Sequence, residues 1–120
     1  MKQLNILVVD DDAENAASIA ELFSIDNHRV IVAYNGQEAI DAYASYDFDV
    51  GFFDVMMPGK NGVESFLEIR KFNPTAKVYF MTGFSEGELL DVARQGGALG
   101  VFLKPTDPGR LLDILDHEAA

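Results

Sequence analysis

Five short apolar runs, separated by segments with helical periodicity, are the feature that most restricts how this chain of 120 residues can fold. Each run is rich in β-branched or aromatic residues and is nearly continuous rather than alternating. Such runs predict strands that are buried on both faces, as in a parallel sheet. The five runs are Leu4–Val9, Val30–Ala33, Val50–Phe53, Val78–Met81 and Val101–Leu103.

The segments that follow the runs have apolar residues at the spacing of amphipathic helices. The groups are Ala16, Ile19, Ala20 and Phe23; Gly36, Ala39, Ile40 and Tyr43; Val63, Phe66 and Leu67; Leu89, Val92 and Ala93; Leu111, Ile114 and Leu115. Predicted helix starts are the pairs Asn35 with Glu38, Asn61 with Glu64, Ser85 with Glu88, and Asp107 before Pro108. The pair Gly96-Gly97 predicts a left-handed helix end.

A strand followed by a helix, repeated five times, predicts an α/β fold. Right-handed crossovers make the strands parallel and place helices on both faces, which gives an open, doubly wound, five-stranded sheet. We expect one domain over residues 1–120. Ligands of such sheets bind beyond the carboxyl ends of the strands, where the strand order reverses, so the functional residues are expected there.

Charge and composition exclude several classes of function. Nine Lys and Arg against twenty Asp and Glu give a net charge of −11, which disfavours direct binding to nucleic acid or to an anionic membrane surface. The absence of cysteine excludes disulfides, thiolate zinc sites and a thiol nucleophile. No apolar run is long enough to span a bilayer and the start does not resemble a signal peptide, so we expect a cytoplasmic protein.

Polar residues follow four of the predicted strands at the point where each ends: Asp10-Asp11-Asp12, Asp54, Thr82 and Lys104. Each alone is explained by a helix cap or a solvated loop, but together they bring carboxylates, a hydroxyl and an ammonium to one pocket. Carboxylates that gather without His or Cys favour a hard cation such as Mg²⁺, or Mn²⁺ with the same ligands. For Asp12 we favour capping of the next helix over a role in the pocket.

Other phosphate and metal motifs are absent from the sequence. It contains neither the G-x-x-x-x-G-K-[ST] loop nor the G-x-G-x-x-G fingerprint of nucleotide-binding folds. The run Asp10-Asp11-Asp12 also lacks the alternating ligand spacing of an EF-hand.

The residues at the strand ends resemble those of the receiver domain of two-component response regulators, and the resemblance covers essentially the whole chain. The matching segments are Val8-Val9-Asp10-Asp11, Asp54-Val55-Met56-Met57-Pro58-Gly59 with Asn61-Gly62, Met81-Thr82-Gly83, and Lys104-Pro105. Each is short, but four in order at the expected strand ends are specific. The resemblance implies a flavodoxin-like (βα)5 fold and a signalling module rather than a turnover enzyme.

The resemblance also implies the phosphoacceptor. Asp54 would take a phosphoryl group from a phosphohistidine of a histidine kinase or phosphotransfer protein. Neither His28 nor His117 is expected near the pocket, so the donor must be another protein. Attack by a carboxylate on an anionic phosphoryl group requires cations that offset the repulsion.

Further roles follow from the same resemblance. Asp10 and Asp11 would hold Mg²⁺ together with Asp54 and the backbone carbonyl of Met56. Lys104, which precedes a cis peptide bond in many family members, would pair with the phosphoryl oxygens. Thr82 would donate a hydrogen bond to them once the phosphate is bound.

The sequence departs from the family at Val101, where many receivers carry Tyr or Phe that moves inward on phosphorylation. Phe102 is adjacent, but strand alternation turns it to the opposite face. The usual aromatic switch is therefore in question at this position, whereas the phosphorylation chemistry is not.

Met56 and Phe84 lie two residues beyond Asp54 and Thr82, where family members vary and where water would approach the acyl phosphate. Both side chains are bulky and neither can orient a water molecule. One hypothesis is that they slow hydrolysis of the phosphorylated form by occluding that water. The alternative is that Phe84 simply packs on the neighbouring helix.

The resemblance implies an output or homodimer surface formed by the helix around Leu89–Ala93, the strand Val101–Leu103 and the helix around Leu111–Leu115. An effector domain is another partner for this surface. Gly87, expected inside the first of these helices, and Gly96-Gly97 at its end favour a loosely held element.

Two alternatives remain open from the sequence. One is a receiver-like interaction domain that is not phosphorylated, for which Val101 leaves room. The other is a phosphatase of the haloacid dehalogenase type that would use Asp10 and Asp12, but that fold needs a longer chain.

Overall fold

Five parallel strands form one sheet in the order β2-β1-β3-β4-β5 in the computed structural model, which describes residues 2–84 and 87–120. The strands are β1 (Asn5–Val9), β2 (Arg29–Ala33), β3 (Val50–Asp54), β4 (Val78–Thr82) and β5 (Gly100–Leu103). A helix follows each strand: α1 (Ala13–Ser24), α2 (Gly36–Ser45), α3 (Gly62–Phe72), α4 (Glu88–Gln95) and α5 (Pro108–Ala119). The predicted doubly wound α/β fold is confirmed.

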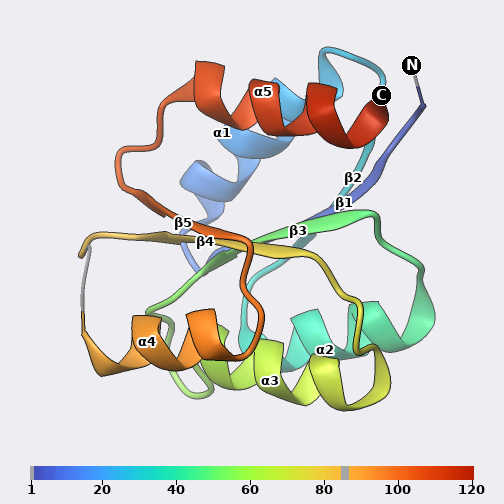
Figure 1. Ribbon diagram of the computed structural model, residues 1–120. Coiled ribbons are helices and arrows are strands. Elements are labelled where there is room, and N and C mark those ends of the chain that lie inside the picture. Colours follow the sequence, from blue (N-terminus) through green and yellow to red (C-terminus); the bar gives the residue numbers. More distant parts are fainter. Residues whose placement is uncertain (1, 85–86) are drawn as a thin grey trace.

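The helices cover the two faces of the sheet in two layers, with α1 and α5 on one face and α2, α3 and α4 on the other (Figure 1). Side chains alternate between the faces along each strand. In β3, for example, Phe52 belongs to the core beneath α1 and α5, and Phe53 belongs to the core beneath α2, α3 and α4. Both residues are fully buried, which explains why this strand reads as a continuous apolar run.

The strand order reverses between β1 and β3, which pair with each other in the inner part of the sheet. The chain turns from β1 to one side to form β2 and later returns to the other side to form β3. The helix after β1, α1, and the helix after β3, α3, therefore pass to opposite faces of the sheet from this point. The carboxyl ends of these two strands form the crevice in which doubly wound proteins bind their ligands.

Burial along the strands follows their place in the sheet. The central strands β1 and β3 are buried on both faces as predicted. The same prediction is wrong for β2 and β5, where Ile31 and Leu103 are 36% and 52% exposed. These two strands lie at the edges of the sheet, where the helices do not fully cover them.

Most of the predicted helix ends are confirmed. Asn61 and Glu64 form a complete capping box at α3, and the Asn35 side chain accepts a hydrogen bond from the backbone of Glu38 at α2. Asp107 caps α5, with Pro108 at its first position. Gly97 follows α4 with a φ of 102°, the left-handed conformation expected after a helix.

The start of α4 differs from the prediction. The helix begins at Glu88, and Gly87 precedes it with a φ of 132°, so the expectation that Gly87 lies inside the helix is wrong. Glycine tolerates this backbone conformation, which other residues rarely adopt. Ser85, the predicted cap, lies outside the described residues. Among the residues that are described, no helix has the length and apolar composition needed to cross a bilayer.

Candidate metal-binding site

Three carboxylates meet at the switch point of the sheet. Asp54 is the last residue of β3, and Asp10 and Asp11 directly follow β1, its neighbour. One oxygen from each lies within 4.8 Å of the others. Asp10 and Asp54 are buried, at 0% and 6% exposure, whereas Asp11 is exposed. The structure therefore brings together the three aspartates that the sequence singled out.

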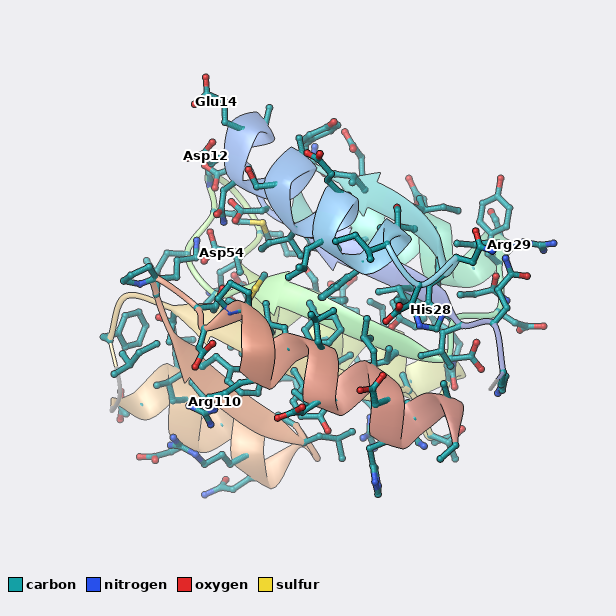
Figure 2. All side chains as sticks on the ribbon, turned by 90° about the horizontal axis from the view of Figure 1, so that it is seen from above. Asp12, Glu14, His28, Arg29, Asp54 and Arg110 are labelled. Carbon is teal, nitrogen blue, oxygen red and sulfur yellow. The ribbon has the colours of Figure 1, made fainter. Side chains whose placement is uncertain are left out.

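Figure 2 shows the position of this cluster relative to the rest of the molecule. Asp54 lies at the end of the molecule where Asp12 and Glu14 begin α1, and His28 and Arg29 lie at the opposite end. The expectation that His28 is remote from the pocket is confirmed.

Lys104 supplies a cation between two of the carboxylates. Its Nζ lies 3.3 Å from Oδ2 of Asp10 and 3.2 Å from Oδ2 of Asp54. The backbone N–H of Lys104 donates to the carbonyl of Thr82 at 2.7 Å, which ties the end of β5 to the end of β4. The peptide bond between Lys104 and Pro105 is cis, as the resemblance implied.

The charges at this site do not balance, because the cluster holds three carboxylates and Lys104 supplies one ammonium, which pairs with Asp10 and Asp54. Burial raises the pKa of Asp54, and the charges of Asp10 and Asp11 add to this while Lys104 opposes it. Burial lowers the pKa of Lys104, but the charges of Asp54 and Asp10 outweigh it and hold that pKa above its ordinary value. Excess negative charge on oxygen ligands alone fits a hard divalent cation such as Mg²⁺.

Asp12 lies beside the cluster but has a local role. Its Oδ1 accepts hydrogen bonds from the backbone N–H groups of Glu14 at 3.0 Å and Asn15 at 3.2 Å. These bonds satisfy two of the free donors at the start of α1. The interpretation of Asp12 as a helix cap is confirmed.

Asn15 belongs to the site although sequence reasoning did not identify it. Its Nδ2 donates to Oδ2 of Asp10 at 2.5 Å. Side chains in a helix tilt toward its amino end, so a polar residue in the first turn can reach back to the strand end before it. A signal was therefore present in the sequence: Asn15 lies on the first turn after the acidic run.

Thr82 is buried at the end of β4, on the strand next to β3. Its Oγ1 accepts a hydrogen bond from the backbone N–H of Phe84 at 3.3 Å. Phe84 itself packs against the core beneath α2, α3 and α4. Met56, in the loop after β3, exposes 57% of its surface.

Val101 and Phe102 lie on opposite faces of β5, as strand alternation predicted. Val101 packs against the core beneath α2, α3 and α4, whereas Phe102 is buried in the core beneath α1 and α5. Phe102 therefore cannot take the place of the aromatic residue that many receivers carry at the position of Val101.

A groove of about 620 Å³ opens beside the acidic cluster, between α1 and the segment from Lys104 into α5. Asn15 and Ser18 line it from α1, and Lys104, Pro105 and Thr106 line it from the other side. The groove thus brings solvent to Asn15 and Lys104, the two side chains that cover the fully buried Asp10 carboxylate.

Comparison with known proteins points to one family. The response regulator receiver domain matches residues 6–116. The transcriptional regulatory protein ZraR of Klebsiella oxytoca is 34% identical over 119 residues, which are 99% of this chain and 27% of that protein. The chain therefore spans about a quarter of the length of the first curated relatives it matches.

Two further matches cover nearly the whole of both chains. Chemotaxis protein CheY of Thermotoga maritima is 29% identical over 112 residues, 92% of this chain and 93% of that protein. The crystal structure of a CheY-like receiver domain protein from Methanospirillum hungatei has a TM-score of 0.92 at 24% identity, over 98% of this chain and 94% of that one.

Proposed function

This chain belongs to the response regulator receiver domain family, and from that premise we propose that Asp54 accepts a phosphoryl group from a phosphohistidine of a partner protein. Receiver domains are signalling modules rather than turnover enzymes. The observation that carries the proposal is the convergence of Asp10, Asp11 and Asp54 at the switch point, with the Lys104 ammonium between Asp10 and Asp54.

In the proposed reaction, a carboxylate oxygen of Asp54 attacks phosphorus while the bond from phosphorus to the donor imidazole nitrogen breaks. The bonding electron pair leaves with the imidazole, and Asp54 becomes an acyl phosphate. The transition state is loose and highly anionic, so charge neutralisation and positioning dominate catalysis. Lys104 already lies 3.2 Å from Asp54, close enough to pair with the incoming phosphoryl oxygens.

Asp10, Asp11 and Asp54 are the residues that would hold Mg²⁺, with the backbone carbonyl of Met56 as a further ligand. The ion would supply positive charge to the phosphoryl oxygens and offset their repulsion by the carboxylates. Thr82, whose Oγ1 accepts a hydrogen bond from the Phe84 N–H, would donate its own O–H to the phosphoryl group. That new hydrogen bond is the first step by which phosphorylation would reach the surface.

The proposed donor is a histidine kinase or a phosphotransfer protein, and the proposed location is the cytoplasm. The output surface would be formed by α4, β5 and α5, where Val92 and Leu103 are 41% and 52% exposed. It would bind an effector domain or a second copy of this chain. Val101 packs in the core with no ring to move, so switching would proceed through Thr82 without an aromatic partner at this position.

The proposal is tested by incubating the protein with Mg²⁺ and a small phosphodonor such as acetyl phosphate, and then measuring its intact mass. We expect one added phosphoryl group in the wild type and none in Asp54→Asn or without metal. Asp49→Asn, which changes an aspartate at the other end of β3, is the matched control and should be phosphorylated normally. An adduct that persists in Asp54→Asn would refute the proposed phosphoacceptor.

A further inference from the structure

Asn15 contributes to the acidic site in a way that the proposed roles do not cover. We propose that Asn15 is a positioning residue for Asp10, whose carboxylate it holds in the orientation that binds Mg²⁺. In this role it also keeps Asp10 in place when Lys104 pairs with the phosphoryl group. This inference rests on the proposed function of the site.

Hydrogen bonds hold the Asp10 carboxylate on both oxygens. Oδ1 accepts from the backbone N–H of Asp12 at 3.0 Å. Oδ2 accepts from Asn15 Nδ2 at 2.5 Å and lies 3.3 Å from Lys104 Nζ. Asp10 is fully buried, and a buried carboxylate depends on such donors because water cannot replace them.

The three donors are not equivalent. The Asp12 N–H holds only Oδ1, which leaves the carboxylate free to turn about that contact. Lys104 is shared with Asp54 and is the cation proposed to move toward the phosphoryl oxygens. Asn15 is the donor on Oδ2 that can stay in place through the reaction, and it is neutral, so it adds no charge to the metal site.

The backbone around Asn15 fixes the side chain where it is needed. Its N–H donates to the Asp12 side chain at 3.2 Å, which holds the first turn of α1 against the end of β1. The residue is half-buried and borders the groove between α1 and α5, so a substitution there does not disturb the apolar core. Groups that orient metal ligands in this way typically change metal affinity by about 10- to 100-fold when removed.

The test is the dissociation constant of Mg²⁺, measured by isothermal titration calorimetry on the unphosphorylated protein. Asn15→Leu keeps the branched outline of the side chain, removes the amide donor and should raise the constant about tenfold. Asn15→Gln keeps a donor and should recover most of the affinity. Ser18→Leu, one turn further along the same groove, is the matched control and should bind Mg²⁺ as the wild type does.

A spectroscopic readout separates positioning from general stability. The side-chain amide resonances of Asn15 should shift in ¹H–¹⁵N spectra when Mg²⁺ is added. The reason is that the ion would bind Asp10, which accepts the hydrogen bond from this amide. Asn15→Ala, which has no donor, is a second variant in case Asn15→Leu unfolds, and circular dichroism checks both. If Asn15→Leu or Asn15→Ala remains folded and binds Mg²⁺ with wild-type affinity, the inference is wrong while the proposed function stands. A wild-type protein that neither binds Mg²⁺ nor forms a phosphate adduct would overturn the proposed function as well.

Discussion

Two aspartates mark the ends of strand β3, Asp49 just before it and Asp54 as its last residue, and the pKa values of their side chains shift in opposite directions. Partial burial acts to raise the pKa of Asp49, before the strand, but hydrogen bonds from the Asn5 backbone and Lys2 outweigh it and lower the pKa. Burial raises the pKa of Asp54, at the other end, and Lys104 does not compensate. The same residue type is thus stabilised as a carboxylate at one end of the strand and destabilised at the other.

The difference lies in how charges are paired at the two ends of the sheet. Near the amino ends, Lys2 pairs with Asp49 at 2.8 Å, and Lys77 pairs with Glu118 at 2.9 Å. At the carboxyl ends, three carboxylates lie together, and one ammonium pairs with two of them, Asp10 and Asp54. Pairing of one cation with one anion serves the fold, whereas a buried excess of negative charge is costly without a ligand.

The largest expected effect is on the rate of Asp54 phosphorylation, when the cation at the Asp54 end of β3 is removed and the cation at the Asp49 end serves as the comparison. Lys104→Gln should lower the rate of Asp54 phosphorylation about 100-fold or more, because a positioned charge on the transition state is lost. Lys2→Gln should leave the rate unchanged, because its partner Asp49 is at the other end of the strand. The rate of adduct formation, followed by intact mass, measures both variants. An equal loss of phosphorylation rate in Lys104→Gln and Lys2→Gln would contradict the different roles of the two lysines.

The next effect is on stability in the presence of metal. At a Mg²⁺ concentration about 100 times the dissociation constant, the free energy of unfolding should rise by about 2.7 kcal/mol. Asp49→Asn should keep this increase, and Asp11→Asn should lose most of it because a ligand is gone. Thermal denaturation with and without Mg²⁺ measures the increase. A Mg²⁺ effect that survives in Asp11→Asn would place the ion elsewhere.

A smaller effect is expected on the metal-free protein as pH changes. Because the folded pKa of Asp54 is raised, its stabilising contribution is present below the unfolded pKa and is lost as pH rises through the folded pKa. For Asp49 the pKa is lowered, so its contribution is present above the unfolded pKa and is lost as pH falls through the folded one.

Substitution at each end should therefore act in opposite directions at neutral pH. Asp54→Asn should increase the free energy of unfolding by about 1–2 kcal/mol, a typical size for a single substitution. Asp49→Asn should decrease it by about 1 kcal/mol or less, as for other partly exposed ion pairs. Urea denaturation between pH 3 and 8 measures both, and the Asp54→Asn gain should shrink toward the acidic end. A gain that persists at the acidic end would contradict the raised pKa.

The fold and most of the site could be predicted because each depended on short stretches of sequence. Continuous apolar runs indicated buried strands, and Asp10, Asp54, Thr82 and Lys104 stood at their ends. Parallel strands place their carboxyl ends on one edge of the sheet, so these residues had to approach one another. The structure brings Asp10 and Asp54 to the same ammonium.

What the sequence could not show depends on spatial relations beyond a single run. The exposure of Ile31 follows from the edge position of β2, which the run itself does not encode. The first-turn position of Asn15 is visible in the sequence, but its contact with Asp10 also requires the rotation of α1 about its axis, which periodicity fixes only approximately. The prediction that Gly87 lies inside α4 was wrong by one residue, because a helix boundary is uncertain by one or two residues where no side chain caps it.

The smallest expected effect concerns the lifetime of the phosphorylated form, which Met56 and Phe84 are predicted to prolong. Phe84 is held against the core, whereas Met56 exposes 57% of its surface. Replacing either with a residue that orients water, in Met56→Asn or Phe84→Glu, should speed loss of the phosphate about three- to tenfold, equivalent to about 1 kcal/mol. Decay of the adduct mass after removal of the phosphodonor measures this.

The matched control for this prediction is Tyr46→Asn, which changes a side chain of similar exposure, 59%, remote from the phosphoacceptor in the loop between α2 and β3. It should leave the lifetime as it is in the wild type. Equal decay in Met56→Asn, Phe84→Glu and Tyr46→Asn would show that neither side chain restricts water. The two positions would then be ordinary loop and packing residues, and the contrast between the ends of the sheet would rest on charge alone.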